Sequence, residues 1–193
     1  MKNSPLIDCL LQFTTLNPSQ VELIEAATTT RSCAAGAYFS RAGQVAREVG
    51  FVNTGIFRVL YYDHEGKEIT RYFLEEGKFM VDMNSFGPGI PSTEYIQAVT
   101  EAEITVLSKE AMEELSRTIL VWDSLIAKIT AKAMAEKVVR VSYMMPQDAT
   151  QRYQSFLKLY PQLANQIPLH YIASYIGVTK SSLSRLRKNL GKS

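Results

Sequence analysis

The sequence has little of what metal sites, disulfide scaffolds and membrane spans require. Its 193 residues include only two cysteines, Cys9 and Cys33, which lie far apart and show no metal-ligand spacing. No apolar run approaches the roughly 20 residues that cross a bilayer, and the first residues lack the cleavage site of a signal peptide. We therefore expect a cytoplasmic protein with no metal, no cofactor and no membrane partner.

Motifs that carry catalysis are missing as well. The chain contains no P-loop, no Gly-rich dinucleotide loop and no Ser/His/Asp set. A metal enzyme on a small β-barrel would need two or three histidines with a carboxylate on adjacent strands. His64, in a predicted turn, and His170, outside the predicted barrel, do not supply that set. The sequence therefore predicts a binding protein and not an enzyme.

Charge is distributed unevenly along the chain. Residues 1–117 hold 10 Lys and Arg against 16 Asp and Glu, a net charge of −6. Residues 118–193 hold 11 Lys and Arg against 3 Asp and Glu, a net charge of +8. This asymmetry indicates two modules, the second of which faces a polyanion such as nucleic acid. A basic solvated face is the alternative explanation.

The first module, residues 1–117, alternates short β-type runs with turns. A helix beginning at Asn17-Pro18 precedes these runs. The clearest hairpin joins residues 56–62 to residues 67–74 through an Asp-His-Glu-Gly turn. Short strands at this spacing are typical of a small antiparallel barrel or sandwich. We therefore predict an α+β protein that begins with such a barrel and its flanking helices.

A long helical stretch without glycine or proline follows, over residues 118–145. A helix of about 24 residues measures about 36 Å, which is more than a barrel of this size would cover. Its apolar residues repeat at spacings of 3 and 4, which predicts a seam against a second copy of the helix. Packing of the same stripe on the barrel is the alternative. The predicted dimer seam comprises Ile119, Trp122, Ile126, Ile129 and Ala133.

The last module, residues 146–193, carries a helix-turn-helix pattern. Pro168 suits the start of one helix, and Gly177 suits the tight turn that ends it. Thr179 suits the cap of a second helix, and the small Ala173 lies where two steeply crossing helices would touch. The pattern predicts a helix-turn-helix, with a generic helical hairpin as the alternative.

The second helix of this pattern separates its leucines from its basic and hydroxyl residues. Arg185 is suited to the edge of a guanine base, and Lys188 to phosphate oxygens, which position a protein without specifying sequence. Lys180 suits either partner, and His170 suits a phosphate or solvent. The candidate DNA-contacting residues are Thr179, Lys180, Ser181, Ser182, Ser184, Arg185, Lys188 and His170.

The order of these parts resembles the Crp/Fnr, or catabolite activator, family of bacterial transcription regulators. The segments FVNTGIFRVLYYDHEGKE at residues 51–68, YIQAV at 95–99 and IASYIGVTKSSLSRL at 172–186 carry the resemblance. It implies a jelly-roll-like β-roll of the cyclic-nucleotide-binding type, a dimerisation helix and a C-terminal helix-turn-helix. It also implies a homodimer on double-stranded DNA, with RNA polymerase as a further partner. We expect the family's β-hairpin wing to be absent, because the sequence ends three residues after Leu190.

In nucleotide-binding members of this family, a Gly-Glu pair holds the ribose, and an Arg-Ser or Arg-Thr pair grips the cyclic phosphate. The resemblance places Val81-Asp82 and Ser92-Thr93 at these positions, so the phosphate-binding arginine is missing. The four-cysteine iron–sulfur signature is missing too, and nothing supports a heme. We therefore expect an unknown effector or none, and no tight binding of cyclic AMP. The candidate effector pocket comprises Phe79, Asp82, Met83, Ser92, Thr93 and Tyr95.

These features together predict a transcription regulator that binds a specific DNA sequence as a homodimer on an inverted repeat. The alternative is a dimeric interaction protein with the same fold that has lost specific DNA reading.

Overall fold

The computed structural model describes residues 3–144 and 148–190. Their contacts divide them into two compact units. Among the described residues, the first comprises residues 3–59 and 73–133, and the second comprises residues 60–72, 134–144 and 148–190. The predictions made for the two ends of the chain and for residues 145–147, including the expected absence of a wing after Leu190, concern residues outside the described ranges. Within the described part of the chain, no helix has the length and apolar character needed to span a bilayer.

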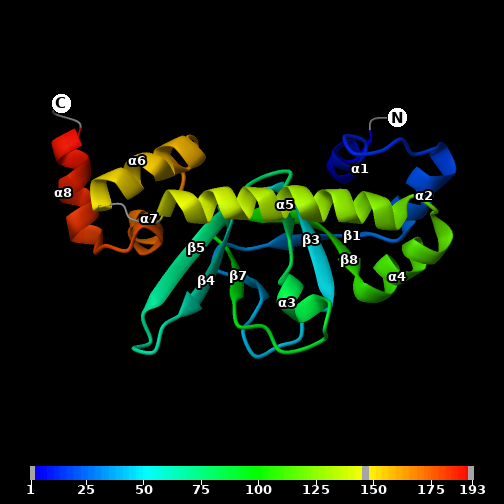
Figure 1. Cartoon of the computed structure of the whole chain (residues 1–193), viewed down its shortest axis with the longest axis horizontal. Helices are drawn as coiled ribbons and strands as arrows, with labels where there is room; N and C mark the ends of the chain where they lie inside the picture. Colours follow the sequence, from blue (N-terminus) through cyan, green and yellow to red (C-terminus); the bar gives the residue numbers. More distant parts are fainter. Residues whose placement is uncertain (1–2, 145–147, 191–193) are drawn as a thin grey trace. The chain divides into compact units, whose positions relative to one another are not determined.

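Eight short strands form two four-stranded sheets, with strand orders β1-β8-β3-β6 and β2-β7-β4-β5. Strand β3 pairs antiparallel with β8 from Glu48 opposite Ser108 to Val52 opposite Ile104. The predicted antiparallel β architecture is therefore confirmed (Figure 1). The strands are β1 (Thr29–Cys33), β2 (Tyr38–Ser40), β3 (Glu48–Thr54), β4 (Phe57–Tyr62), β5 (Glu68–Leu74), β6 (Phe79–Met80), β7 (Tyr95–Ala98) and β8 (Ala102–Ser108).

Helices precede and follow the strands of this β-sandwich in the sequence, and one short helix, α3, lies between β6 and β7. They are α1 (Pro5–Leu10), α2 (Pro18–Ala26), α3 (Met83–Phe86), α4 (Lys109–Thr118) and the long α5 (Trp122–Met144). Helix α2 begins as predicted, because Asn17 and Gln20 form a capping box in which each side chain accepts from the other's backbone N–H at 2.9 Å. Helix α1 was not predicted, although its Ser4 cap and Pro5 are visible in the sequence.

A hydrophobic core joins α1, α2 and α4 to the first turn of α5. Its members are Leu6, Ile7, Leu10, Ile24, Phe51, Leu107, Leu115, Ile119, Trp122 and Leu125. Ile119 is 1% exposed and Trp122 is 2% exposed within the single chain. Their assignment to a dimer seam is therefore wrong, because the chain's own core already covers them. Ile126 and Ile129 are half-buried against the same core, and Ala133 is exposed.

The second unit contains the end of α5, the β4–β5 hairpin from residue 60 to residue 72, and a group of short helices. These are α6 (Ala149–Leu159), the 3-10 helix η1 (Leu163–Asn165), α7 (Leu169–Ile176) and α8 (Lys180–Leu190). Aromatic rings fill the core of the unit, with Phe156 5.5 Å from Tyr160 and 5.7 Å from Tyr175 between ring centroids. Burial, together with the neighbouring Tyr160, raises the pKa of the Tyr175 hydroxyl above its ordinary range.

Candidate DNA-contacting helix and sensor pocket

Helices α7 and α8 are joined by a tight turn at Gly177. This residue has φ 71° and ψ 36°, a left-handed conformation in which a Cβ atom is strained. The Val178 N–H donates to the carbonyl of Ala173 at 3.0 Å and closes the end of α7. Ala173 and Leu183 are buried where the two helices pack. The turn therefore sets the direction in which α8 leaves α7.

Three hydroxyl groups gather at the start of α8. The Thr179 Oγ1 accepts from the backbone N–H of Ser182 at 3.2 Å, as expected of a helix cap. It also lies 3.0 Å from the Ser181 Oγ and 2.9 Å from the Ser182 Oγ. These side chains are exposed. The helix thus begins with three hydroxyl groups at its N-terminus, an arrangement that suits anionic oxygens.

The exposed side of α8 carries positive charge only. All eight candidate DNA-contacting side chains are exposed, including His170 on α7. From residue 149 to residue 190 the chain has no Asp or Glu. A shallow hollow of about 560 Å³ lies beside the helix start and is lined by Leu169, Thr179, Lys180, Ser181 and Ser184. The structure therefore brings the predicted residues of α8 together on one basic, hydroxyl-rich surface.

The candidate effector residues Asp82 and Ser92 bind each other. The Ser92 Oγ donates to the Asp82 Oδ2 at 2.6 Å, and the Asp82 Oδ1 accepts from the Asn84 N–H at 3.0 Å. The Ser92 Oγ also accepts from the Glu94 N–H at 3.1 Å. Asp82 is 6% exposed and Ser92 is 4% exposed. The two groups expected to hold a ribose and a phosphate are therefore used within the protein.

The other candidate effector residues do not join this pair. Phe79 packs edge-on against Phe51 in the core, with ring centroids 5.0 Å apart, and Tyr95 packs edge-on against Tyr38 at 5.7 Å. Met83 and Thr93 are exposed. A single pocket lined by these residues therefore stays a prediction. A hollow of about 220 Å³ beside Asp82 is lined instead by Phe39, Ser40, Gln44, Val45, Ala46, Arg47, Glu48 and Val81.

Arg58 is a buried cation that the sequence reading missed. It is 1% exposed, and its Nε and Nη2 donate to the Gln97 Oε1 at 2.9 and 2.6 Å. Gln97 in turn donates from its Nε2 to the Gly36 carbonyl at 3.0 Å. An arginine inside the apolar run IFRVLYY is the signal that was available in the sequence. Its hydrogen bonds tie β4 to β7, so we assign it a structural role.

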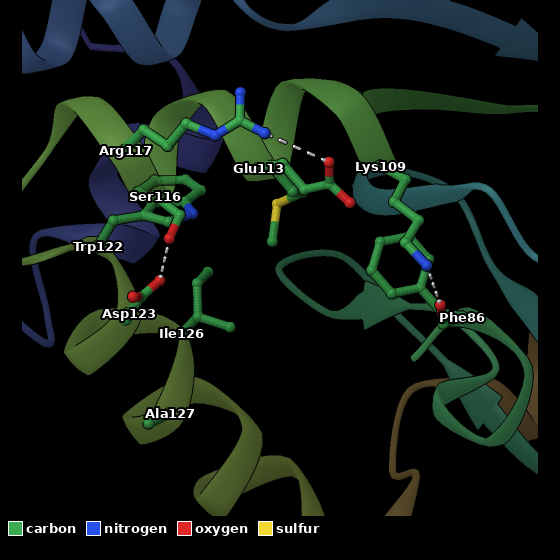
Figure 2. A pocket seen from close by; sticks show the side chains of 10 residues that line it. Phe86, Lys109, Glu113, Ser116, Arg117, Trp122, Asp123, Ile126 and Ala127 are labelled. Carbon is green, nitrogen blue, oxygen red and sulfur yellow. Dashed lines mark hydrogen bonds and ion pairs between the residues drawn. The ribbon is translucent and has the colours of Figure 1, made fainter. Parts of the chain in front are cut away.

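A groove of about 520 Å³ lies between α4, the start of α5 and Phe86 (Figure 2). Its rim is held by contacts among its own polar groups. The Lys109 Nζ donates to the Phe86 carbonyl at 3.0 Å, and the Ser116 Oγ donates to the Asp123 Oδ1 at 2.7 Å. Arg117 and Glu113 form an ion pair at 3.8 Å (Figure 2). The groove therefore presents satisfied polar groups around the side chains of Met112, Trp122 and Ile126.

The β-sandwich is similar to a known family of domains. Residues 30–118 match the cyclic nucleotide-binding domain family, and no curated protein sequence matches the chain. The structure of FixK2 from Bradyrhizobium japonicum is similar with a TM-score of 0.73 and 16% identity, covering 86% of this chain and 85% of that one.

Two further solved structures share the fold over most of their length. The c-di-GMP responsive global regulator CLP of Xanthomonas campestris has a TM-score of 0.71 and 18% identity, covering 91% of this chain and 92% of that one. A protein of Eubacterium rectale assigned to the Crp/Fnr family of transcriptional regulators also has a TM-score of 0.71 and 18% identity, covering 91% of this chain and 84% of that one.

Residues 30–118 thus form a β-sandwich similar to the cyclic nucleotide-binding domain. Over most of its length the chain shares the fold of these three solved structures, one of them from the Crp/Fnr family of transcriptional regulators.

Replacing Ser92 with alanine removes the hydroxyl that joins Asp82 to the Glu94 N–H. We expect Ser92→Ala to lower the free energy of unfolding by about 2 kcal/mol, because a buried carboxylate loses a donor. Thr93→Ala, one residue away and exposed, is the matched control and is expected to change it by less than about 0.5 kcal/mol. Urea denaturation measures both values, and equal stability of the two variants would contradict the assigned role of Ser92.

Proposed function

We propose that this protein is a transcription regulator that binds a specific DNA sequence as a homodimer on an inverted repeat. The observation that carries the proposal is the exposed surface of α8, which combines hydroxyl groups with lysine and arginine and has no acidic residue. DNA is the polyanion that such a helix suits, because a helix of this width enters the major groove. RNA polymerase as a further partner rests on the family resemblance alone.

Some residues of α8 are proposed to contact base edges, and others to contact phosphates. In helix-turn-helix proteins the first turns of the second helix face the base edges. Ser181 and Ser184 are short, so they let the backbone approach the bases closely. Arg185 then reaches the O6 and N7 atoms of a guanine with two hydrogen bonds. Lys188, one turn further along the helix, neutralises phosphate.

Two alanine variants separate these roles. Arg185→Ala is expected to weaken binding to the selected site by about 1–3 kcal/mol and to relax selection at one base position in each half-site. Lys188→Ala is expected to weaken all sequences alike and to reduce the slope of log affinity against log salt by about one.

Titration of selected and random duplexes at several salt concentrations measures both effects. An Arg185→Ala variant that loses equal affinity for both duplexes would remove this residue from the base edge. A protein that enriches no sequence from a random pool would instead be the dimeric interaction protein that no longer reads DNA.

The proposed dimer uses the face of α5 that lies opposite the protein core, together with Leu120 just before the helix. Leu120, in the turn that precedes α5, is 97% exposed, and on the helix Met134 is 53% exposed and Val138 is 65% exposed. With small residues between them, these positions recur at spacings of 4 and 3, as in a two-stranded coiled coil. The proposed seam, which replaces the predicted one, is Leu120, Ser124, Ala127, Ala131, Met134 and Val138.

A parallel pair of α5 helices suits the proposed DNA site. The charges that flank the seam do not set this direction, because the Asp123 Oδ1 accepts from the Ser116 Oγ at 2.7 Å and the Lys128 Nζ donates to the Phe13 carbonyl at 3.2 Å. The direction follows instead from symmetry, since parallel helices related by a two-fold axis present both copies of α8 toward the same end of the dimer, as an inverted repeat requires.

Two aspartate variants of α5 test this seam. Ala131 lies on the proposed seam, whereas Ala133 lies off it, and both are exposed alanines within one helix. We expect Ala131→Asp to give monomers, because two carboxylates would face each other in apolar surroundings. Ala133→Asp should remain dimeric. Sedimentation velocity at micromolar concentration decides, and a monomeric wild-type protein or the reverse pattern would contradict the proposal.

The sensor domain is proposed to have an effector other than cyclic AMP, or none. The missing arginine and the Asp82–Ser92 hydrogen bond support this, because a nucleotide would have to displace an internal pair. Isothermal titration with cyclic AMP is expected to show no binding at micromolar concentration. Cyclic di-GMP belongs in the same experiment, since the similar CLP responds to it. Micromolar binding of cyclic AMP would overturn the assignment.

A further inference from the structure

Ser174, on helix α7, contacts the backbone of strand β5. Its Oγ accepts a hydrogen bond from the Thr70 N–H at 2.9 Å and donates one to the Glu68 carbonyl at 2.9 Å. All three residues belong to the second compact unit. Strand β5 is the last strand in its sheet order, so one of its edges has no neighbouring strand. The hydroxyl thus binds the edge of a sheet where another strand would otherwise pair.

The geometry of this contact repeats that of a strand pairing. In a parallel ladder, one residue donates to the carbonyl of residue i and accepts from the N–H of residue i+2 on the neighbouring strand. Ser174 makes both bonds, to Glu68 and Thr70, with a single oxygen atom. This requires a group that is donor and acceptor at once, which serine and threonine hydroxyls are and alanine is not.

Ser174 also lies close to the elements that position α8. It stands between Ala173, which packs where α7 and α8 meet, and the buried Tyr175. Three residues later Gly177 makes the turn into α8. A second contact comes from α5, where the Arg140 guanidinium lies 5.1 Å from the centroid of the Tyr72 ring at the end of the hairpin. The hairpin therefore contacts both α5 and α7 within this unit.

We propose that Ser174 is a latch that makes the β4–β5 hairpin part of the DNA-binding unit and sets the direction of α8. Strands β4 and β5 are hydrogen-bonded in one sheet of the β-sandwich, and residues 60–72 of the hairpin belong to the same compact unit as α7. Through α7, the latch restricts how far α8, the proposed DNA-reading helix, can rotate relative to the hairpin. Only a restricted helix discriminates between spacings of the two half-sites, because a freely turning one reaches several spacings equally well.

The first experiment tests the latch without DNA. Residue-resolved amide exchange by NMR compares the wild-type protein with Ser174→Ala and Ser174→Thr. Alanine favours a helix more than serine does, so α7 is retained in the first variant. We expect the Thr70 amide to exchange about tenfold faster or more in Ser174→Ala, and to stay protected in Ser174→Thr. Equal protection in wild type and Ser174→Ala would overturn the latch, whatever the protein binds.

The second experiment rests on the proposed function and measures spacing. Duplexes carry the selected half-site once, or twice with the natural spacing or with two base pairs added. For Ser174→Ala we expect unchanged affinity for the single half-site and a loss of about tenfold in preference for the natural spacing. Ser174→Thr should keep that preference. An unchanged preference in Ser174→Ala would overturn the latch and leave the proposed function standing. Absence of specific binding in the wild type would overturn the proposed function. The latch would then be decided by the Thr70 amide exchange alone.

Discussion

The burial of one face of α5 is the constraint on which the rest of the first unit depends. Trp122, Leu125 and Ile119 are covered by α1, α2 and α4, so the rotation of α5 about its own axis is set within a single chain. A helix rotated in this way must expose the residues on its far side. Those residues are apolar or small where an ordinary surface helix would be charged. The hydrophobic core thereby decides which face of α5 stays exposed.

Buried polar side chains in the β-sandwich are hydrogen-bonded to one another. Asp82 and Ser92 have little contact with water and are bonded to each other, and Arg58 is bonded to Gln97. Burial of such groups is costly unless each finds a partner. Here the partners come from the chain itself.

Local patterns in the sequence sufficed for much of the fold. The Asn17 cap, the hairpin around residues 63–66 and the turn at Gly177 were predictable because each depends on residues close together in the chain. The exposed residues of α8 were predictable for the same reason, since its apolar stripe is short and packs on a neighbouring helix. Helix α1 was missed because its six residues show no repeating pattern.

The predictions failed where one sequence pattern fits two different faces. Spacings of 3 and 4 in and just before α5 fit two stripes, Ile119–Ile129 and Leu120–Val138. Packing of α1, α2 and α4 on the first stripe decides which of the two is buried. In the same way, the sequence predicts that Asp82 and Ser92 contact a ligand. In the structure the two side chains are hydrogen-bonded to each other. The sequence by itself determined the class of fold and the basic, exposed face of α8, because these follow from local periodicity and charge. The tertiary structure alone decided which side chains remain available to a partner, because burial is a property of contacts between segments that are far apart in the chain.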